Sequence, residues 1–327
     1  MVGGGTVLDK KEDMTHRAIP GPESVIPCFH AYCTYHCRFC SQRGSAVGKR
    51  RWSLDQIKSL ESLWDQAKSV NIGGVGEIGI LPDINEIIGY FGSRNLQIAF
   101  TSNGRYLDVP YLRTQPLGGV LISLHTVDEA TYDNLTGTTG NLPHVMENIR
   151  RLAERPRKYG CKVTCVLTEH NVRQAPETAR FCRDAGVDHV RFTHLITTVD
   201  YPPDIPMKES PENHKALREA FEIMHDGQAP PDTNATGRCE IPVLAGQREP
   251  LVARKMPSCR APYKQMVINL DGQVVPCCLI TANRVKFGNV FETPWEDIWY
   301  GEKMETFRKS LKDGTNPHCL KYCKNWG

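Results

Sequence analysis

Three cysteines, Cys33, Cys37 and Cys40, stand close together near the start of this 327-residue chain with the spacing C-x3-C-x2-C. Three thiolates on one loop can bind three irons of a cubane iron–sulfur cluster, which usually takes four cysteines. The fourth iron is then open to a small molecule. A structural zinc site needs four protein ligands, and this spacing is not the paired C-x2-C of zinc modules. The spacing therefore favours an iron–sulfur cluster with one open position.

The same spacing resembles the signature of the radical S-adenosylmethionine (SAM) enzymes, in which the methionine end of SAM chelates the open iron. The resemblance implies that the reduced cluster passes one electron to the sulfonium of SAM. The resulting 5′-deoxyadenosyl radical then takes hydrogen from a substrate C–H bond. The cofactors supply this chemistry, and the protein positions them. Phe39, directly before the last cysteine, is implied to pack beside the adenine.

The composition, 40% apolar and 24% charged residues, is typical of a soluble globular enzyme. A net charge of +3 without a basic stripe gives no reason to expect nucleic acid as a partner. No run of 18 apolar residues occurs, and the chain starts without a secretion signal, so we expect no membrane partner. Thirteen cysteines without an export signal indicate metal and redox use in a reducing cytoplasm. We therefore expect a cytoplasmic enzyme.

Elements that could position the cysteine loop follow from the alternation of short apolar runs with helical patterns. A first strand near Val25 and Ile26 is followed by strands near 70–74, 96–100, 119–124, 162–167 and 189–192. Ser53 to Gln56 form a capping box that opens the first helix. Six βα units predict a parallel sheet with right-handed crossovers. We expect an α/β fold, a partial (β/α)6 TIM-like barrel with its ligand site at the carboxyl ends of the strands.

The chain divides into four predicted segments. Residues 1–22 are Gly-rich and aperiodic, which indicates disorder. Residues 23–200 form the barrel, and the proline-rich residues 201–258 form a linker or lid with one helix from Ser210 to about His225. Residues 259–327 form a small domain built from a β-hairpin and a helix.

Further loops at the strand ends resemble the radical SAM family. Gly76 and Glu77 look like its Gly-Gly-Glu segment near the SAM amino group, although Val75 separates the glycines and Ile78 replaces a frequent proline. A Thr-Ser-Asn-Gly turn that resembles a turn of the family follows the third strand. A Ser and a His stand at the end of the fourth strand, at positions that contact the SAM carboxylate or ribose in the family. The cofactor-binding residues that the resemblance implies are Phe39, Gly76, Glu77, Thr101, Ser102, Asn103, Ser123 and His125.

A second cysteine group lies in the C-terminal segment, around a hairpin with Asp271 and Gly272 at its turn. This segment resembles the SPASM/twitch extension of radical SAM enzymes, which carries auxiliary 4Fe–4S clusters. The resemblance implies two 4Fe–4S clusters in the chain, one that binds SAM and one auxiliary. It also implies an external electron donor of the flavodoxin or ferredoxin type. A structural zinc site with the same ligands is the alternative. The implied auxiliary ligands are Cys259, Cys277, Cys319 and Cys323.

The reaction is open between several types. The C-terminal stretch looks like that of small members that act on aminocyclitols, and only about 22 residues precede the first strand, too few for a peptide-recognition domain. We therefore expect a small polar substrate and, first, a sugar or aminoglycoside epimerase whose hydrogen donor is the thiol of Cys278 or, second, Cys239. The alternatives are an alcohol dehydrogenase, with the auxiliary cluster as electron acceptor, and a peptide-modifying enzyme. A non-catalytic electron carrier would not need Gly76 and Glu77 or the Thr-Ser-Asn-Gly turn.

Overall fold

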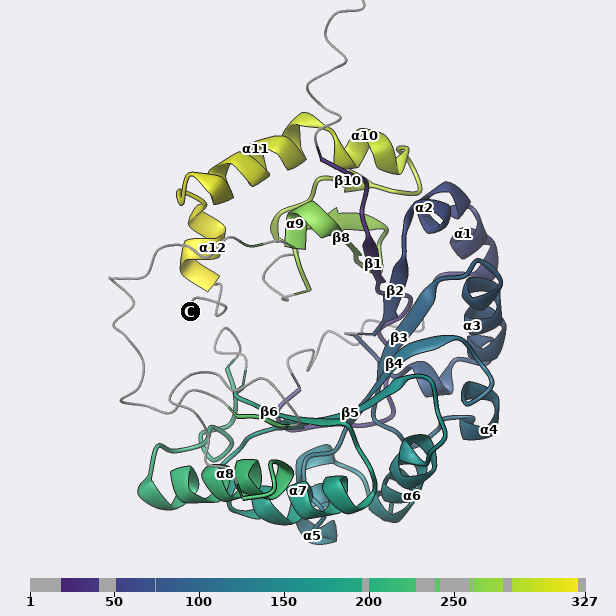
Figure 1. Ribbon diagram of the computed structural model, residues 1–327. Coiled ribbons are helices and arrows are strands. Elements are labelled where there is room, and N and C mark those ends of the chain that lie inside the picture. The colour runs from purple at the N-terminus through teal and green to yellow at the C-terminus, as the bar shows by residue number, and fades with distance from the viewer. Residues whose placement is uncertain are drawn as a thin grey trace, which may run out of the picture.

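The structure is a computed structural model, which describes residues 19–40, 51–73, 75–195, 200–227, 239–241, 259, 261–278 and 284–322. The described strands form one curved sheet with the order β10-β9-β8-β1-β2-β3-β4-β5-β6-β7 (Figure 1). The pairs from β8 through β1 to β7 are all parallel, and β9 pairs antiparallel with both β8 and β10. The strands are β1 (Ser24–Pro27), β2 (Ser69–Ile72), β3 (Gln97–Ser102), β4 (Leu117–Ser123), β5 (Gly160–Val166), β6 (His189–Thr193), β7 (Cys239–Glu240), β8 (Gln265–Ile268), β9 (Gln273–Val275) and β10 (Gly288–Asn289).

Helices cover the outer side of this sheet, and α10 and α11 continue the outer row beyond β10 (Figure 1). The two edge strands, β10 and β7, do not pair in the described part of the chain, so the sheet is an open partial barrel. The predicted fold class is therefore confirmed. The helices are α1 (Leu54–Lys58), α2 (Glu61–Gln66), α3 (Ile84–Ser93), α4 (Val109–Leu112), α5 (Glu129–Thr136), α6 (Leu142–Ala153), α7 (Ala175–Asp184), α8 (Pro211–Met224), α9 (Ala261–Lys264), α10 (Trp295–Trp299), α11 (Glu302–Lys312) and α12 (Pro317–Tyr322), with 3-10 turns η2 (Ile78–Ile80) and η3 (Val172–Gln174).

The main core lies between the sheet and the helices because alternate strand residues point to opposite faces. On β5, Cys161 and Cys165 are fully buried on the helix side, and Cys182 of α7 belongs to the same core. These three cysteines therefore act as small apolar side chains. None of the helices in the described ranges is long and apolar enough to cross a lipid bilayer.

The first predicted helix is broken in two. The capping box is present: Gln56 N donates to Ser53 Oγ over 3.1 Å, and Ser53 N donates to the Gln56 side chain over 2.9 Å. The helix does not continue past Lys58, because the carbonyl of Ile57 accepts from Leu60 N and from the indole of Trp64. The helix expected after the capping box is therefore two short helices, α1 and α2.

The proline-rich segment takes part in the barrel. Helix α8 packs beside α7 on the outer side of the sheet, and β7 pairs with β6 (Figure 1). This adds a further βα unit that the sequence did not suggest. The boundaries of the four segments stay a prediction, and most of the N-terminal segment, residues 1–18, lies outside the described residues.

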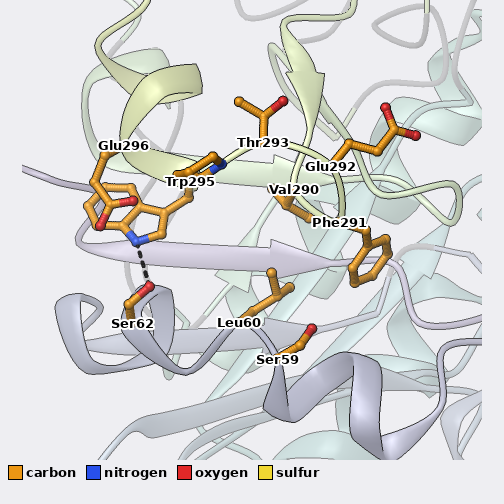
Figure 2. Close-up of a pocket in the computed structure, with 10 residues that line it drawn as sticks. Ser59, Leu60, Ser62, Val290, Phe291, Glu292, Thr293, Trp295 and Glu296 are labelled. Carbon is orange, nitrogen blue, oxygen red and sulfur yellow. Dashed lines mark hydrogen bonds between the residues drawn. The ribbon is translucent and has the colours of Figure 1, made fainter.

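The C-terminal segment is fastened to the start of the barrel. The indole of Trp52 donates to the carbonyl of Leu270 over 2.9 Å, and the indole of Trp295 donates to Ser62 Oγ over 3.2 Å. Figure 2 shows a pocket of about 230 Å³ at this seam, between the α1–α2 junction and residues 290–296. The pocket lies among helices and loops that do not include the cysteine loop.

An ion pair between a buried arginine and a partly exposed aspartate closes the amino ends of β5 and β6. Arg157, whose side chain is 3% exposed, pairs with Asp188 over 2.8 Å. Asp188 also accepts from Cys161 N over 2.8 Å. Burial opposes ionisation of Asp188, but the bonds from Arg157 and Cys161 hold its pKa below its usual range.

Asp188→Asn should lower the free energy of unfolding by about 2 kcal/mol, because it leaves a buried guanidinium without its counter-charge. Urea denaturation followed by circular dichroism measures the effect. Asp184→Asn is the matched control, since Asp184 is 66% exposed and pairs only with its neighbour Arg183. The control should change stability by less than about 0.5 kcal/mol. Equal losses in both variants would contradict a structural role for the buried pair.

Candidate active site

Residues 28–40, called the cluster loop below, leave the carboxyl end of β1 and carry Cys33, Cys37 and Cys40. All three thiols are half-buried, and Tyr35 N donates to Cys33 Sγ over 3.4 Å. Burial raises the pKa of Cys33 and of Cys37, so loading with iron has to displace protons from these thiols. Among the described residues no three His, Cys, Asp or Glu side chains converge on one metal ion. A cubane cluster does not need three side chains that converge on one ion, because each thiolate binds a different iron atom.

The end of α5 holds the cluster loop from one side. The last carbonyls of a helix lack partners within it. Here those of Leu135 and Thr136 accept from the backbone N–H groups of Arg38 and His36, both over 2.9 Å. Gly137 follows with φ +65°, and a Cβ there would lie 2.9 Å from His36 Cβ. Only glycine therefore fits where the cluster loop crosses the helix end.

Arg38, between two of the cysteines, fastens the loop to residues 201–208. Its guanidinium pairs with Asp204 over 2.5 Å and donates to Asn134 over 3.2 Å. His170 contacts the same carboxylate of Asp204 over 2.9 Å. Hydrogen bonds from His170 and Arg38 lower the pKa of Asp204. Beside this pair, Phe39 packs in a small apolar cluster with Leu135 and Ile205.

Glu77 joins the cluster loop to the loops after β2 and β3. It is 2% exposed, and its carboxylate accepts from Ser102 Oγ and Asn103 N, each over 2.6 Å, and from Gly79 N over 2.8 Å. Its own N–H donates to the carbonyl of Tyr32 over 2.8 Å. Burial raises the pKa of Glu77 although these hydrogen bonds oppose the shift. The structure thus brings Glu77, Ser102 and Asn103 together as the sequence suggested, with Glu77 in a positioning role.

Gly76 is required by close packing at the same place. It has φ +78°, and a Cβ there would lie 2.7 Å from the carbonyl oxygen of Tyr32 and 2.8 Å from the ring of His30. The first glycine of the predicted segment, Gly74, lies outside the described residues.

His125 and Phe39 form an aromatic corner at the carboxyl end of β4. Their ring centroids are 4.4 Å apart in an edge-to-face arrangement. His125 Nδ1 accepts from Val166 N over 3.2 Å, which puts the ring proton on Nε2. Burial lowers the pKa of His125 to about 3, so the ring is neutral at physiological pH. A neutral, fixed imidazole can donate a hydrogen bond from Nε2 but cannot supply a positive charge.

Ser123 and Thr101, the remaining predicted cofactor residues, are half-buried near the carboxyl ends of β4 and β3. Asn171 was missed by sequence reasoning. Its amide donates to the carbonyls of His125 and Val166 over 2.8 and 2.9 Å, so it holds the aromatic corner in place. The position of Asn171 in the polar turn after the fifth predicted strand was the sequence signal that could have identified it.

In the described part of the chain, buried polar atoms without a hydrogen-bond partner include Thr34 Oγ1 and both ring nitrogens of His30 in the cluster loop, and Asn103 Nδ2 beside it. Buried polar groups are normally paired. The carboxylate, amino group and ribose hydroxyls of SAM are the kind of partners these atoms lack. The residues present therefore fit this cofactor.

One of the described auxiliary cysteines, Cys277, lies toward the other end of the sheet. Strand β8 runs parallel to β1 and β9 runs back, so Cys277, after β9, returns toward the amino end of β1. It packs on the inner face beside Ile26, Val267 and Val275. Cys259 stands just before α9, and Cys323 lies outside the described residues.

Asn316 sets the orientation of Cys319. Its side-chain oxygen accepts from Cys319 N over 2.9 Å, which caps α12, and its amide donates to Ser310 Oγ of α11 over 2.8 Å. Asn316 is 4% exposed. The helix that carries Cys319 therefore begins at a point fixed by α11.

Arg38→Met should release the cluster loop from residues 201–208 without unfolding the barrel, since exposed ion pairs contribute only about 0–1 kcal/mol. We expect the reconstituted protein to lose iron to a chelator several-fold faster than wild type, because a cluster is retained by the loop that holds its ligands. Asp204→Ala should act alike, and the double variant should be no worse than either. Additive effects of the two substitutions would contradict a direct Arg38–Asp204 link.

Asn316→Ala should lower the iron bound by about one four-iron cluster while SAM-dependent chemistry at the first site is retained. Asn316→Asp should restore most of the iron, because the carboxylate still caps Cys319. Iron analysis and Mössbauer spectroscopy of the anaerobic protein measure both. Full iron in Asn316→Ala would show that the cap does not serve an auxiliary cluster.

Comparison with known proteins agrees with this geometry. The family model of the radical SAM superfamily matches residues 28–200, and an iron–sulfur cluster-binding domain named SPASM matches residues 259–325. Similar relatives include the tungsten-containing aldehyde ferredoxin oxidoreductase cofactor-modifying protein of Pyrococcus furiosus, 23% identical over 88% of this chain and 83% of that protein. The antilisterial bacteriocin subtilosin biosynthesis protein AlbA of Bacillus subtilis is 22% identical over 88% of this chain, which spans only 62% of AlbA.

Among solved structures, SuiB of Streptococcus suis bound to its precursor peptide SuiA superposes with a TM-score of 0.69, at 18% identity, over 95% of this chain and 73% of SuiB. The sequence match to an aminocyclitol dehydrogenase is short by comparison. A 2-deoxy-scyllo-inosamine dehydrogenase of Niallia circulans is 34% identical over 20% of this chain and 26% of its own length.

The two matched domains confirm the predicted cofactors, SAM and two 4Fe–4S clusters, one for SAM and one auxiliary. The two domain matches do not identify the reaction as an epimerisation or a dehydrogenation. The match over residues 28–200, more than half of the sequence, shows that this chain belongs to the radical SAM superfamily.

Proposed function

We propose that this chain is a radical SAM enzyme that modifies a peptide. The observation that supports the proposal is the large share of this chain that is similar to AlbA and SuiB. AlbA, a bacteriocin biosynthesis protein, and SuiB, solved with a precursor peptide, are similar to this chain across both of its cofactor domains. The likeness to the dehydrogenase covers only a fifth of the chain. The expected small-molecule epimerase therefore has less support than the peptide-modifying alternative.

Cys33, Cys37 and Cys40 are proposed to hold the cluster that binds SAM. When bound, SAM and the reduced cluster supply a carbon-centred radical that takes hydrogen from a C–H bond of the substrate. Phe39 and His125 offer an apolar corner to the adenine, and Nε2 of the neutral His125 can donate a hydrogen bond. Ser123 and Thr101 present hydroxyls at the same edge of the sheet.

Glu77 is proposed to act on SAM through its neighbours. Its carboxylate already accepts three hydrogen bonds, from Ser102, Asn103 and Gly79. Asn103 Nδ2 and the hydroxyl of Thr34 are buried and have no hydrogen-bond partner in the described part of the chain. We assign contacts with the methionine end of SAM to these two groups.

Cys259, Cys277, Cys319 and Cys323 are proposed as ligands of the auxiliary cluster. An external flavodoxin or ferredoxin stays the proposed electron donor. Cys278, next to Cys277, is exposed. Its thiol is the proposed hydrogen donor only if the reaction inverts a carbon. Cys239 lies in β7, and the position of its side chain is not described.

Replacing Cys33, Cys37 and Cys40 by Ala should reduce the iron of the anaerobically reconstituted protein from about eight to about four atoms. The variant should form no 5′-deoxyadenosine, because SAM has no open iron to bind. Cys278→Ala is the control and should keep about eight irons. A triple variant that still cleaves SAM would refute the assignment of the catalytic cluster.

The substrate class can be tested with the wild-type enzyme. Peptides encoded beside its gene and a panel of aminoglycosides and aminocyclitols are incubated with SAM and reductant in deuterated water, and products are analysed by mass spectrometry. We expect a mass change in a peptide only. An aminocyclitol product two units lighter would favour the dehydrogenase, and an aminoglycoside that gains one deuterium would favour the epimerase.

A further inference from the structure

The inner face of the sheet carries a lysine, Lys162, that has no ion-pair partner among the described residues. On β5 the residues Cys161, Val163 and Cys165 point toward the outer helices and are fully buried. Lys162 and Thr164 therefore point to the opposite, inner face, which helices α1 to α8 leave uncovered (Figure 1). Lys162 is exposed there, although its strand lies in the middle of the sheet between β4 and β6.

The register places Lys162 near the amino ends of β5 and β6, because its partner His189 is the first residue of β6. Lys162 pairs with Leu121 of β4 and with His189 of β6, whereas Ser123 pairs with Thr164 two residues nearer the carboxyl ends. At about 3.3 Å per residue, Lys162 lies roughly 7 Å deeper than the Ser123–Thr164 level. A substrate that reaches past SAM into the barrel would meet it.

Nothing in the described part of the chain neutralises this lysine. Its ammonium forms no ion pair or hydrogen bond there, and its Cε lies 3.7 Å from the position a Cβ on Gly160 would take. The nearest acid, Asp188, is occupied by Arg155, Arg157 and Cys161 N. The ammonium therefore has no counter-charge of its own among the described residues.

Most of the strands that line the inner face add no negative charge that would oppose the positive charge of Lys162. None of the strands β1–β6, β8 and β9 contains an Asp or a Glu. Arg191 of β6 points inward as well; its register partner in β7 is Glu240, and the inference does not depend on its charge. The inward neighbours Thr101, Ser123 and Thr164 are uncharged hydrogen-bonding groups.

We propose that Lys162 is a specificity-determining residue that binds an anionic group of the substrate, the carboxylate of a Glu or Asp side chain in a peptide. This rests on the proposed peptide-modifying function and deepens it. A charge-assisted hydrogen bond between ammonium and carboxylate is short and strong where water is partly excluded. The same lysine repels the ammonium groups of aminoglycosides, so the inner face selects against the substrate class first expected.

Binding to two peptides tests the proposal directly. The probes are capped, fluorescein-labelled dodecapeptides of Gly and Ser that differ only in a central Glu or Lys. Anisotropy is measured on SAM-loaded, cluster-replete protein without reductant. We expect wild type to bind the Glu peptide about 10-fold tighter than the Lys peptide, as one charge-assisted hydrogen bond allows.

The variants should then follow the charge at position 162. Lys162→Gln should abolish the preference and Lys162→Glu should reverse it. Lys158→Gln, which removes an exposed lysine just before β5, should behave as wild type. Iron content and circular dichroism verify folding, and SAM affinity should be unchanged in all variants. An unaltered preference in Lys162→Gln, or a loss of SAM affinity there, overturns the proposal; the second result would assign Lys162 to the SAM carboxylate.

A second measurement separates this proposal from the peptide function itself. Lys162 of the SAM-loaded wild type is acetylated with and without succinate as a small dianion, and its modification is quantified by mass spectrometry with Lys158 as internal control. If neither peptide binds but succinate protects Lys162 several-fold, the anion site stands and the peptide function fails. If neither peptide binds and succinate gives no protection, the anion site is refuted.

Discussion

The carboxylate of Glu77 accepts hydrogen bonds from Ser102 and Asn103, and its backbone N–H donates to the cluster loop at Tyr32. Three loops from three strands of the sheet thereby share one buried group. Such a network is costly when incomplete, because a buried carboxylate without partners loses its hydration. Here the partners are the loops themselves, so the cluster loop can be ordered although it has little regular secondary structure of its own. The rest of the site depends on this connection.

The second support of the cluster loop comes from a helix end. The last carbonyl groups of a helix have no partner within the helix. Two such carbonyls of α5 accept hydrogen bonds from the backbone of the cluster loop. Gly137 makes this approach possible because any side chain there would overlap with His36. The loop that carries the three thiols is thus held by backbone groups on one side and by Glu77 on the other.

Sequence patterns predicted the strands well because alternating or continuous apolar runs report burial against the helices. The cysteine spacing and the loops around Glu77 and Asn103 also pointed to one site, since parallel strands end at the same edge of the sheet. The roles within that site were less accessible. Glu77 resembled a SAM contact by its position, and only its three hydrogen bonds show that it positions neighbouring groups. Asn171 and Asn316 act through single hydrogen bonds across loops, and such bonds leave no periodic signal.

The inner face of the sheet shows how the same alternation that builds the core also shapes the chemistry of the interior. Every second residue of β5 and β6 is buried against α7 or its neighbours, so the residues between them must face the interior. Lys162 occupies such a position, whereas the corresponding positions on β1 to β4 are uncharged. Arg191 of β6 occupies another and has Glu240 of β7 as its register partner, so it is through Lys162 that the wall formed by β5 carries a positive charge. A bound substrate with one acidic group would be oriented by that wall, with the atoms on its far side turned toward the cluster loop at the carboxyl ends of the strands.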